Sequence, residues 1–466
     1  MQTITTVVDF LNNILWDYIL LFALVGVGIF LSVRLKFPQT TRLFPALGKI
    51  FSDIKNKVEV PEGRMSPFQS LSTAIAAQVG TGNIVGVSTA IASGGPGAAF
   101  WMLLSAFFGM ATIFTEASLA QVFRETKNGE LVGGPAYYIK NGLKSKWLAS
   151  IFAVLCIIAL GIVGIMVQSN SIVHSLNEAF GFSHVWITVA LISVVGIVLT
   201  GGMDRIAGFT EKVVPIMASL YILGSLTILF MHIDRFLPAI KAIFIGAFAP
   251  EAIAGGVLGI TMQHAIRFGL ARGLFSNEAG MGSTPHSHAV ANTDHPAEQG
   301  FIAMIGVFIS TFIICLSTVM VNITSQSYNM HIPANVMEAS ASVMTQNSFA
   351  LSFGKFGSGF LSIALTFFAL TTIVGWYFFA ESNVKFLSGK NKVLIASFKF
   401  IVLAFIVLST YLDPNFVWKL ADLFMGLMAI PNIIALFLLS GIAKKVLEDY
   451  DTGKKAGHVF WKYRYD

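Results

Sequence analysis

The chain has 466 residues, of which 55% are hydrophobic and 12% charged, whereas about a quarter of the residues are charged in an average soluble domain. Apolar runs of about 20 residues recur along its whole length, so the sequence predicts an all-α polytopic membrane protein in a lipid bilayer. The formal net charge of +6 does not indicate a nucleic-acid partner, because the Lys and Arg residues lie between the apolar runs and form no single basic patch.

About eleven of the apolar runs are long enough to be transmembrane helices. Their approximate bounds are 15–34, 66–92, 98–123, 147–174, 184–200, 211–232, 251–275, 297–323, 356–382, 393–411 and 416–442. Basic stretches follow alternate runs, as at 35–65 and 124–146, whereas the loops at 175–183 and 412–415 contain no Lys or Arg. Because positively charged loops stay in the cytoplasm, we expect an outside N-terminus, a cytoplasmic C-terminus and a multi-pass location in the plasma membrane.

A polar interruption divides the second of these runs. It extends from Gln78 to Asn83 (QVGTGN), and each of its two glycines weakens a helix by about 1 kcal/mol relative to Ala. Unwound backbone at membrane depth is tolerated only where it lines a protein-enclosed cavity or water-filled space. Freed carbonyls can bind a cation there, and the N–H groups that open the next half-helix can bind a carboxylate. The interruption therefore predicts the substrate site of a secondary transporter.

A second interruption is predicted near 251–283, where glycines alternate with charged side chains. The residues concerned are Gly269, Gly273, Gly280 and Gly282, together with Arg267, Arg272 and Glu278. When the first span is set aside, the other ten form two groups of five with opposite orientation, and an interrupted helix begins each group. Matching interruptions predict an inverted repeat around a central site. The expected organisation is an extra N-terminal helix with a basic loop (1–65), two five-helix repeats (66–232 and 233–442) and a cytoplasmic tail (443–466).

Three motifs resemble the signatures of the sodium:alanine symporter (alanine or glycine:cation symporter) family. They are Gly94 to Met102 (GGPGAAFWM), Gly161 to Asn170 (GIVGIMVQSN) and Arg272 to Pro285 (RGLFSNEAGMGSTP). Ala99 and Leu103 depart from the family pattern at packing positions. The resemblance implies a LeuT-type fold, in which one extra N-terminal helix precedes ten core helices. The core helices form a 5+5 inverted repeat, and the first and sixth of them are discontinuous. It also implies sodium-driven uptake of small neutral amino acids such as alanine or glycine.

The first interruption offers candidates for both substrate and cation binding. Thr81, Gly82 and Asn83 open the second half-helix, where free N–H groups and the positive end of the helix dipole favour a carboxylate. Gly80 and Gly82 lack a Cβ atom, so a ligand can approach the backbone closely. Asn83 also has a side-chain carbonyl suited to a hard cation. The alternative is a packing kink with a hydrogen-bonded Asn side chain.

Two consecutive threonines in the ninth apolar run, Thr371 and Thr372, are candidate sodium ligands. The resemblance implies that their hydroxyls bind sodium together with the carbonyls of Ala76, Val79 and Phe368. The alternative is that each hydroxyl bonds to a carbonyl of its own helix. Co-transported sodium is the ion that the resemblance implies, and no organic cofactor is expected.

The substrate pocket is expected to draw on three further helices. The resemblance places Gln168 in the pocket, where its amide could bind a polar group of the substrate. Trp376 lies one turn beyond Thr372 and could close a small cavity, although Trp is also a common interfacial anchor. Ser276 or Asn277 could cap a new half-helix at the second interruption. The remaining substrate-binding candidates are Gln78, Asn170 and Phe275.

Ionisable residues at membrane depth suggest a functional role. We expect Glu278 to pair with Arg272 or Arg267 in a gate on the cytoplasmic side, with structural charge neutralisation as the alternative. Glu116 or Glu278 could instead be the titrating group of a proton-coupled carrier.

The leading hypothesis is a sodium-coupled symporter of small neutral amino acids, and the alternative is a proton-coupled carrier of the same fold. An enzyme is not expected, because the sequence has no nucleotide-binding lysine loop, no HExxH and no GxSxG on a plausible turn. A channel, which would need a repeated pore ring, and a membrane-embedded hydrolase are less favoured. The sequence leaves open the choice among alanine, glycine and serine, and the oligomeric state.

Overall fold

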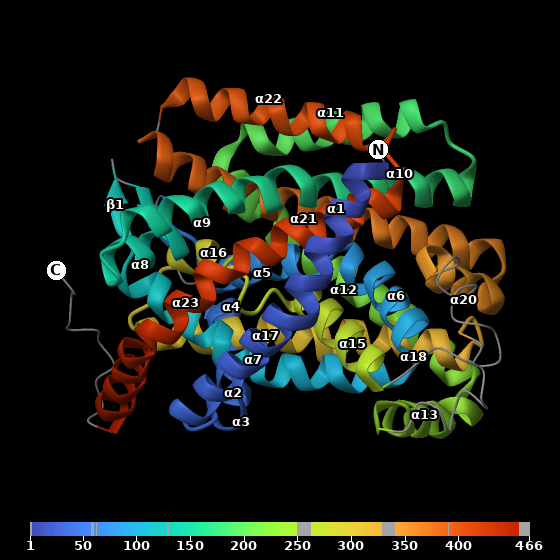
Figure 1. The fold of residues 1–466 in the computed structure, drawn as a ribbon, viewed down its shortest axis with the longest axis horizontal. Helices are drawn as coiled ribbons and strands as arrows, with labels where there is room; N and C mark the ends of the chain where they lie inside the picture. Colours follow the sequence, from blue (N-terminus) through green and yellow to red (C-terminus); the bar gives the residue numbers. More distant parts are fainter. Residues whose placement is uncertain are drawn as a thin grey trace.

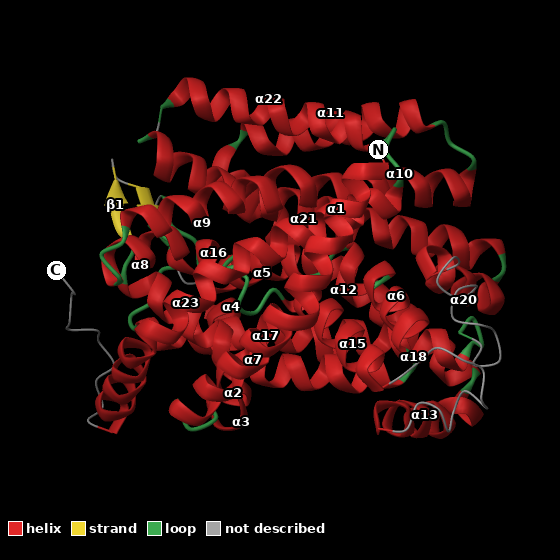
Figure 2. Ribbon diagram, in the orientation of Figure 1, coloured by secondary structure: helices red, strands yellow, loops and turns green. Residues whose placement is uncertain are grey.

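The computed structural model describes residues 2–56, 60–61, 63–127, 130–248, 262–328, 341–389 and 391–455. Almost all of these residues are helical (Figure 2), apart from a two-stranded antiparallel hairpin of β1 (Glu125–Lys127) and β2 (Glu130–Val132) and short connecting loops. Eight of the described helices are long and apolar enough to cross a membrane, and one bent helix pair raises the count to nine. The all-α polytopic membrane architecture predicted from the sequence is thereby confirmed.

The first half of the described chain contains helices α1 to α13. Their bounds are α1 (Gln2–Asn13), α2 (Leu21–Arg34), α3 (Pro38–Thr41), α4 (Leu43–Asn56), α5 (Pro67–Gln78), α6 (Val85–Gly94), α7 (Gly97–Val122), α8 (Pro135–Gly142), α9 (Lys146–Ile158), α10 (Ile165–Phe180), α11 (His184–Thr200), α12 (Gly202–Met231) and α13 (Phe236–Phe248). Short π-helical or 3-10 segments continue or link them at η1 (Ile14–Leu20), η2 (Thr81–Asn83), η3 (Ala159–Gly164) and η4 (Ile233–Arg235).

The second half contains helices α15 to α23. Their bounds are α15 (Met262–Asn277), α16 (Pro285–Ala289), α17 (Pro296–Val307), α18 (Leu316–Thr324), α20 (Met344–Phe353), α21 (Lys355–Ser388), α22 (Lys392–Ser409) and α23 (Pro414–Lys455), with the π-helical η5 (Phe308–Cys315) and the 3-10 turn η6 (Ala341–Val343). The expected count of eleven spans stays a prediction, because α11 has 17 residues and the predicted run at 251–275 begins outside the described residues. The division into two repeats also stays a prediction.

The central helix of the molecule is α21, whose most apolar stretch is 83% buried, against 22% for α22. Figure 1 shows α22 and α11 side by side along one edge, with α21 and α5 in the interior and the N-terminal helices crossing the front face. Large apolar side chains such as Phe22, Phe230 and Phe400 are 68–73% exposed. In a membrane protein, such side chains face the lipid chains, so the polar interior is the feature that needs explanation.

The two ends of the molecule differ in what covers them. The helices α13 and α20 lie at one end, and the β1–β2 hairpin, α8 and the last turns of α23 lie at the other (Figure 1). The long helix α21 runs between these ends.

The first interruption predicted from the sequence is present. A capping box of Ser66 and Gln69, with Pro67 at the first helical position, starts α5 in the manner of many helix N-termini. The helix ends at Gln78, and the chain bends by 60° before it continues into η2 and α6.

The second interruption is also present, but it follows the residues expected to cap a new half-helix. Ser276 and Asn277 are the last residues of α15, so the expectation that one of them caps the start of a half-helix is wrong. Glu278, Gly280 and Gly282 follow with φ values of +57°, +92° and +81°. Left-handed backbone cannot continue a right-handed helix, and the chain becomes helical again only at α16. The residues 251–261 of the predicted run lie outside the described residues.

The chain segments at the far ends of both broken helices are tied together by their backbones. Met65 N–H donates to Val290 O at 3.1 Å, and Asn292 N–H donates to Met65 O at 2.8 Å. The Ser70 hydroxyl of α5 also donates to Ser287 O of α16 at 3.0 Å. These bonds hold α5 and α16 as neighbours, and the two breaks meet where the Gln78 amide at the end of α5 donates to Asn277 O at the end of α15, at 2.8 Å.

Candidate functional site

The first break places backbone N–H groups in the buried centre of the molecule. Gly80 N–H donates to Asn83 Oδ1 at 3.1 Å, and Thr81 N–H donates to Gln168 Oε1 of α10 at 3.1 Å. A Cβ atom on Gly80 would lie 2.5 Å from Thr372 Oγ1, so only glycine permits this approach of the backbone to α21. The predicted convergence of the break with Gln168 is therefore what the structure shows.

Three polar side-chain atoms at this break have no hydrogen-bond partner among the described residues. They are Gln78 Oε1, Thr81 Oγ1 and Gln168 Nε2, and all three side chains are at most 1% exposed. A buried polar group without a partner costs about 1–3 kcal/mol. Such groups persist where a ligand supplies the missing bonds, so the break has the chemistry of a binding site for a small polar molecule.

An oxygen cluster lies next to the break on α21. The Thr372 hydroxyl is 2.8 Å from Ala76 O and 3.0 Å from Phe368 O, and the Thr371 hydroxyl is 2.9 Å from Phe368 O. Each hydroxyl therefore bonds to a carbonyl of its own helix, as the alternative interpretation expected, and Thr372 also reaches across to α5. Val79 is the buried residue at the C-terminal cap of α5. Neutral oxygens from two helices fit a desolvated hard cation such as sodium.

Asn83 lies in a different polar cluster from Thr371 and Thr372. Its Nδ2 atom is 2.8 Å from Ser276 Oγ and 2.9 Å from Ser310 Oγ, and its Oδ1 atom accepts the Gly80 N–H. The Ser310 hydroxyl in turn is 2.9 Å from Gln78 O. Asn83 therefore links the first break, the end of α15 and η5. The expected set of sodium candidates is divided between two places, and a ligand role for Asn83 stays a prediction.

An aromatic wall faces the first break. A Cβ atom on Gly82 would lie 2.7 Å from the Phe275 ring, and the Phe275 and Trp376 rings meet edge to face with centroids 6.2 Å apart. A Cβ atom on Gly164 in η3 would lie 2.7 Å from the Trp376 ring. The predicted pocket residues Thr81, Gln168, Phe275 and Trp376 thus surround the same point.

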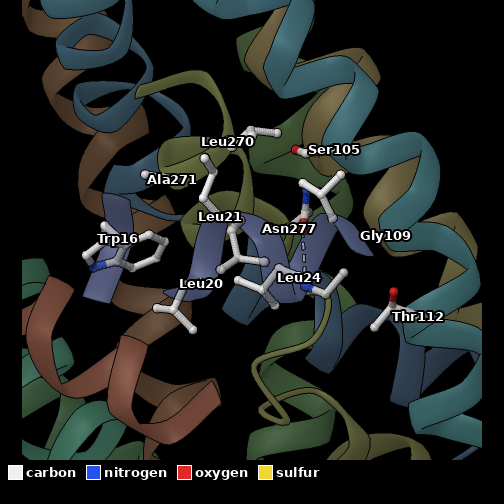
Figure 3. A pocket seen from close by; sticks show the side chains of 13 residues that line it. Trp16, Leu20, Leu21, Leu24, Ser105, Gly109, Thr112, Leu270, Ala271 and Asn277 are labelled. Atoms are coloured by element: carbon white, nitrogen blue, oxygen red, sulfur yellow. Dashed lines mark hydrogen bonds between the residues drawn. The ribbon is translucent and has the colours of Figure 1, made fainter. Parts of the chain in front are cut away.

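Two other candidates have side chains that bind elsewhere. Asn170 Nδ2 donates to Ser409 O at 2.7 Å and to Leu412 O at 3.1 Å, which attaches α10 to the end of α22. Asn277 contacts Gln78 through its backbone carbonyl, at 2.8 Å, while its side chain accepts the Ala279 N–H at 3.0 Å. That side chain borders a small apolar pocket of about 30 Å³ between the N-terminal helix and the α7 and α15 helices (Figure 3).

The expected gate pair between Glu278 and an arginine of α15 is not formed. Arg272 instead makes two bonds to Asp422 of α23, at 2.7 and 3.0 Å, and Arg267 lies 2.7 Å from Asp17. Arg272 precedes Glu278 by six residues, or about 9 Å along a helix axis, and the left-handed backbone at Glu278 turns its side chain toward Trp376. The gate prediction is therefore wrong for this conformation.

Sequence reasoning missed the acidic partner of Arg272 and its aromatic neighbour. Asp422 and Trp418 lie in the last predicted run. The carboxylate of Asp422 at membrane depth could have indicated a functional or paired residue there. The Arg272 guanidinium lies 5.3 Å from the Trp418 ring centroid, and that ring lies 5.1 Å from the ring of Phe275. The ion pair is therefore connected by packing to the aromatic wall.

The unwound segment after α15 is held by a second buried carboxylate. Glu116 of α7 accepts the N–H groups of Gly280 and Gly282 at 3.2 and 3.0 Å, and an amide N–H of Asn432 at 2.6 Å. Three donors on one carboxylate satisfy its charge without a basic partner. Glu116 thus fixes the second break to α7 and α23.

Two larger cavities approach the closed centre from opposite ends of α21. The α10–α23 cavity, of about 190 Å³, is lined by residues that include His174, Trp418, Leu361 and Leu365. The hairpin cavity, of about 530 Å³, is lined by residues that include Glu130, Asp204, Phe378 and Lys385. Leu365 and Phe378 are 13 residues apart on one helix, or about 20 Å, and the buried Thr371 and Thr372 lie between them. A closed polar centre between two opposed cavities is the arrangement of a secondary transporter.

The chain belongs to the sodium:alanine symporter family, whose model matches residues 1–462. This is a family of transporters, not of enzymes. The expectations of transport, symport and amino-acid transport, and the family resemblance found in the three motifs, are confirmed.

Named relatives align with almost the whole chain. The "Probable sodium/glutamine symporter GlnT" of Bacillus subtilis is 40% identical over 99% of this chain and 94% of its own length. The "Sodium/alanine symporter AgcS" of Methanococcus maripaludis is 39% identical over 94% of this chain and 95% of its own length. Among solved structures, a manganese transporter mutant of Eremococcus coleocola shares the fold, with a TM-score of 0.51 at 15% identity over 88% of this chain and 85% of that one.

Proposed function

We propose that this protein is a sodium-coupled symporter that imports small neutral amino acids, with alanine and glycine as the first candidates, across the plasma membrane. Family membership supports a cation-coupled amino-acid symporter. The observation that carries the finer proposal is the pair of unpartnered atoms at the first break, Thr81 Oγ1 and Gln168 Nε2, together with the oxygen cluster of α21.

The substrate carboxylate binds where α6 begins. The N–H groups of Thr81 and Gly82 stand at the positive end of the second half-helix and can donate to an anion. Gln168, whose carbonyl accepts the Thr81 N–H at 3.1 Å, withdraws to make room and offers its amide donor to the substrate. The substrate side chain then meets Phe275 and Trp376, which suits a short apolar group.

Sodium binds at the oxygen cluster as the co-transported substrate. The carbonyls of Ala76 and Phe368 and the hydroxyls of Thr371 and Thr372 supply its ligands, with Val79 O as a further candidate. Because Ala76 belongs to the same broken helix as the carboxylate site, binding of the cation orders the backbone that the amino acid needs. That shared backbone is the basis of coupling.

Alternating access moves the opening from one cavity to the other. In the proposed LeuT-type arrangement, eleven helices comprise one extra helix and two inverted five-helix repeats at 66–232 and 233–442, with the N-terminus outside and the C-terminus cytoplasmic. The α10–α23 cavity is then the outer one and the hairpin cavity the inner one. The Arg272–Asp422 pair, packed on Trp418, closes the outer side.

Proton coupling is the second candidate. Glu116 and Glu278 are fully buried, and no ion pair joins either carboxylate to a basic side chain among the described residues. A carboxylate that loses and regains its donors during the cycle could carry a proton.

Uptake of labelled alanine into proteoliposomes tests both candidates. We expect an inward sodium gradient to drive accumulation at equal pH on both sides, and a proton gradient without sodium to drive none. Accumulation with protons alone would reject sodium coupling. Exchange of labelled for unlabelled alanine without any gradient separates a failure of coupling from a failure to recognise the amino acid.

A further inference from the structure

A buried carboxylate contacts the tryptophan of the proposed pocket. Glu278 Oε1 accepts the indole N–H of Trp376 at 2.5 Å, and Glu278 Oε2 accepts the hydroxyl of Ser283 at 2.5 Å. Glu278 is fully buried, and Trp376 is 1% exposed. Neither partner of this carboxylate is charged. The indole N–H is thus held by a hydrogen bond to a buried carboxyl group in a region that excludes water.

Packing and this bond together define the position of the indole. Gly164 leaves room for the ring on one side, because any Cβ atom there would lie 2.7 Å from two ring carbons. Phe275 meets the ring edge to face on another side, with an interplanar angle of 80°. The bond to Glu278 adds a directional constraint to this packing, because it fixes the ring edge that carries the N–H group.

The backbone at Glu278 supports a role for its side chain. Glu278 has a φ of +57°, a conformation that costs a residue with a Cβ atom about 1–2 kcal/mol and that glycine adopts freely. The unwound segment uses glycine at its other left-handed positions, Gly280 and Gly282. A glutamate at the third such position carries a backbone cost that its two side-chain bonds must offset.

We propose that Glu278 is a specificity-determining positioning residue, which holds the Trp376 indole across the pocket and thereby limits the size of the substrate side chain. The inference rests on the proposed amino-acid transport. Small neutral amino acids fit beneath the indole, whereas glutamine or leucine needs it to turn. Because Glu278 belongs to the second break, the size limit exists only while that break keeps its geometry.

Four variants test the proposal in proteoliposomes. Glu278→Gln keeps an acceptor oxygen for the indole, Glu278→Ala removes it, and Trp376→Phe keeps a ring without the N–H donor. We expect Glu278→Ala and Trp376→Phe each to lower the ratio of alanine to glutamine uptake by about tenfold, and Glu278→Gln to lower it much less. The double variant Glu278→Ala with Trp376→Phe should show no further loss, because both changes remove the same bond.

A matched control is Trp101→Phe. It removes an indole N–H bond to Ala247 O, at 3.1 Å, on α7 and outside the pocket, so the uptake ratio should not change. A Glu278→Ala protein that transports both amino acids more slowly with an unchanged ratio would overturn the proposal. So would additive effects in the double variant. If Glu278→Ala does not fold, the uptake ratios of Glu278→Gln and Trp376→Phe still test the proposal. We expect a much smaller fall in the ratio for Glu278→Gln, and an equal fall in both variants would contradict the proposal.

A spectroscopic measurement separates this proposal from the proposed function. An ultraviolet resonance Raman band of tryptophan reports hydrogen bonding of the indole N–H. The contribution of Trp376 is the difference between spectra of proteins with and without the Trp376→Phe substitution. In Glu278→Ala, this contribution should shift to the position of a weakly bonded indole. An unshifted band would show that Glu278 does not hold the indole, whatever the substrate. If the band shifts in Glu278→Ala but the wild-type protein takes up no amino acid, the bond to the indole is real and the proposed function is rejected. The proposed limit on substrate size is then rejected as well.

Discussion

The two breaks differ in how their backbone and side-chain polar groups are satisfied. At the first break, Thr81 Oγ1 and Gln168 Nε2 have no partner among the described residues, and the short interruption bends the chain by 60°. At the second break, Glu116 holds a longer unwound segment by accepting the Gly280 and Gly282 N–H groups, and the Thr284 hydroxyl is the polar side-chain group of that segment without a partner among the described residues. One break offers groups to a ligand, and the other is anchored to the protein.

This difference separates binding from stability. Unpartnered buried groups cost about 1–3 kcal/mol each, and a ligand that pairs with them returns that energy as affinity. Donors already paired with a buried carboxylate contribute to folding. Substitutions at the first break should therefore change ligand affinity before stability, and substitution of Glu116, which anchors the second break, should do the reverse.

The largest expected effect is at the first break, in Gly82→Leu. A Cβ atom there would lie 2.7 Å from the Phe275 ring, so a leucine side chain would fill the space in which the substrate carboxylate approaches the backbone, and we expect a loss of about 3 kcal/mol, or about a hundredfold in affinity. Alanine binding to the purified protein, measured by scintillation proximity, should fall by that factor. Gly26→Leu on α2, where a Cβ atom meets nothing within 4 Å, is the control. Unchanged alanine affinity in Gly82→Leu would reject the carboxylate site.

At the second break, we expect Glu116→Gln to lower the stability of the protein. Gln has only one acceptor oxygen, and its amide nitrogen is a donor that faces another donor, so it cannot replace all three bonds and the free energy of unfolding should fall by about 2 kcal/mol. Thermal unfolding in detergent measures the loss, and alanine affinity of the folded protein should stay within about twofold. Glu448→Gln, on a side chain that is 60% exposed and 3.6 Å from Lys444, should change neither quantity. An equal loss of alanine affinity would contradict the separation of roles.

At the oxygen cluster, we expect Thr372→Ala to weaken the dependence of uptake on sodium. Removing one oxygen ligand from a closed site should raise the sodium concentration for half-maximal uptake by about tenfold, or about 1.4 kcal/mol, and Thr372→Ser should restore it. Thr227→Ala on α12 removes an exposed hydroxyl that bonds to Leu223 O of its own helix, at 2.8 Å, and should have no effect. Normal sodium activation in a well-folded Thr372→Ala protein would exclude Thr372 as a ligand.

Features that depend on local chemistry were predictable from the sequence. The first break was predicted because two glycines and an amide inside an apolar run disfavour a helix, and the second because glycines and charges alternate there. The place of Gln168 in the pocket came from the family resemblance, and its bond to the Thr81 N–H was not predicted.

Contacts between helices were less predictable. A shift of one residue turns a side chain by about 100° around a helix, so a sequence does not show that Arg272 faces Asp422, 150 residues away. The end of α15 could also not be located to within a turn, because the left-handed Glu278 is not a glycine. That residue directs its carboxylate toward Trp376 and away from the arginines, which is why the expected gate pair is absent.

The smallest expected effect is at the proposed outer gate, in Arg272→Lys. Lysine keeps the charge but loses one of the two bonds to Asp422 and the contact of the guanidinium with the Trp418 ring. The two side chains are 14% and 21% exposed, and partly solvated pairs contribute about 1 kcal/mol or less, so the gate should open about threefold more often. The native thiol of Cys315, which lies 3.0 Å from Ser276 Oγ in the closed centre, can report this opening through its rate of modification by a membrane-impermeant reagent in a Cys156→Ala background. Arg205→Lys, an exposed guanidinium that bonds to the end of α11, should leave the rate unchanged. An unchanged rate in Arg272→Lys, with sodium and alanine affinities intact, would show that the ion pair stabilises α23 against α15 without controlling access to the site.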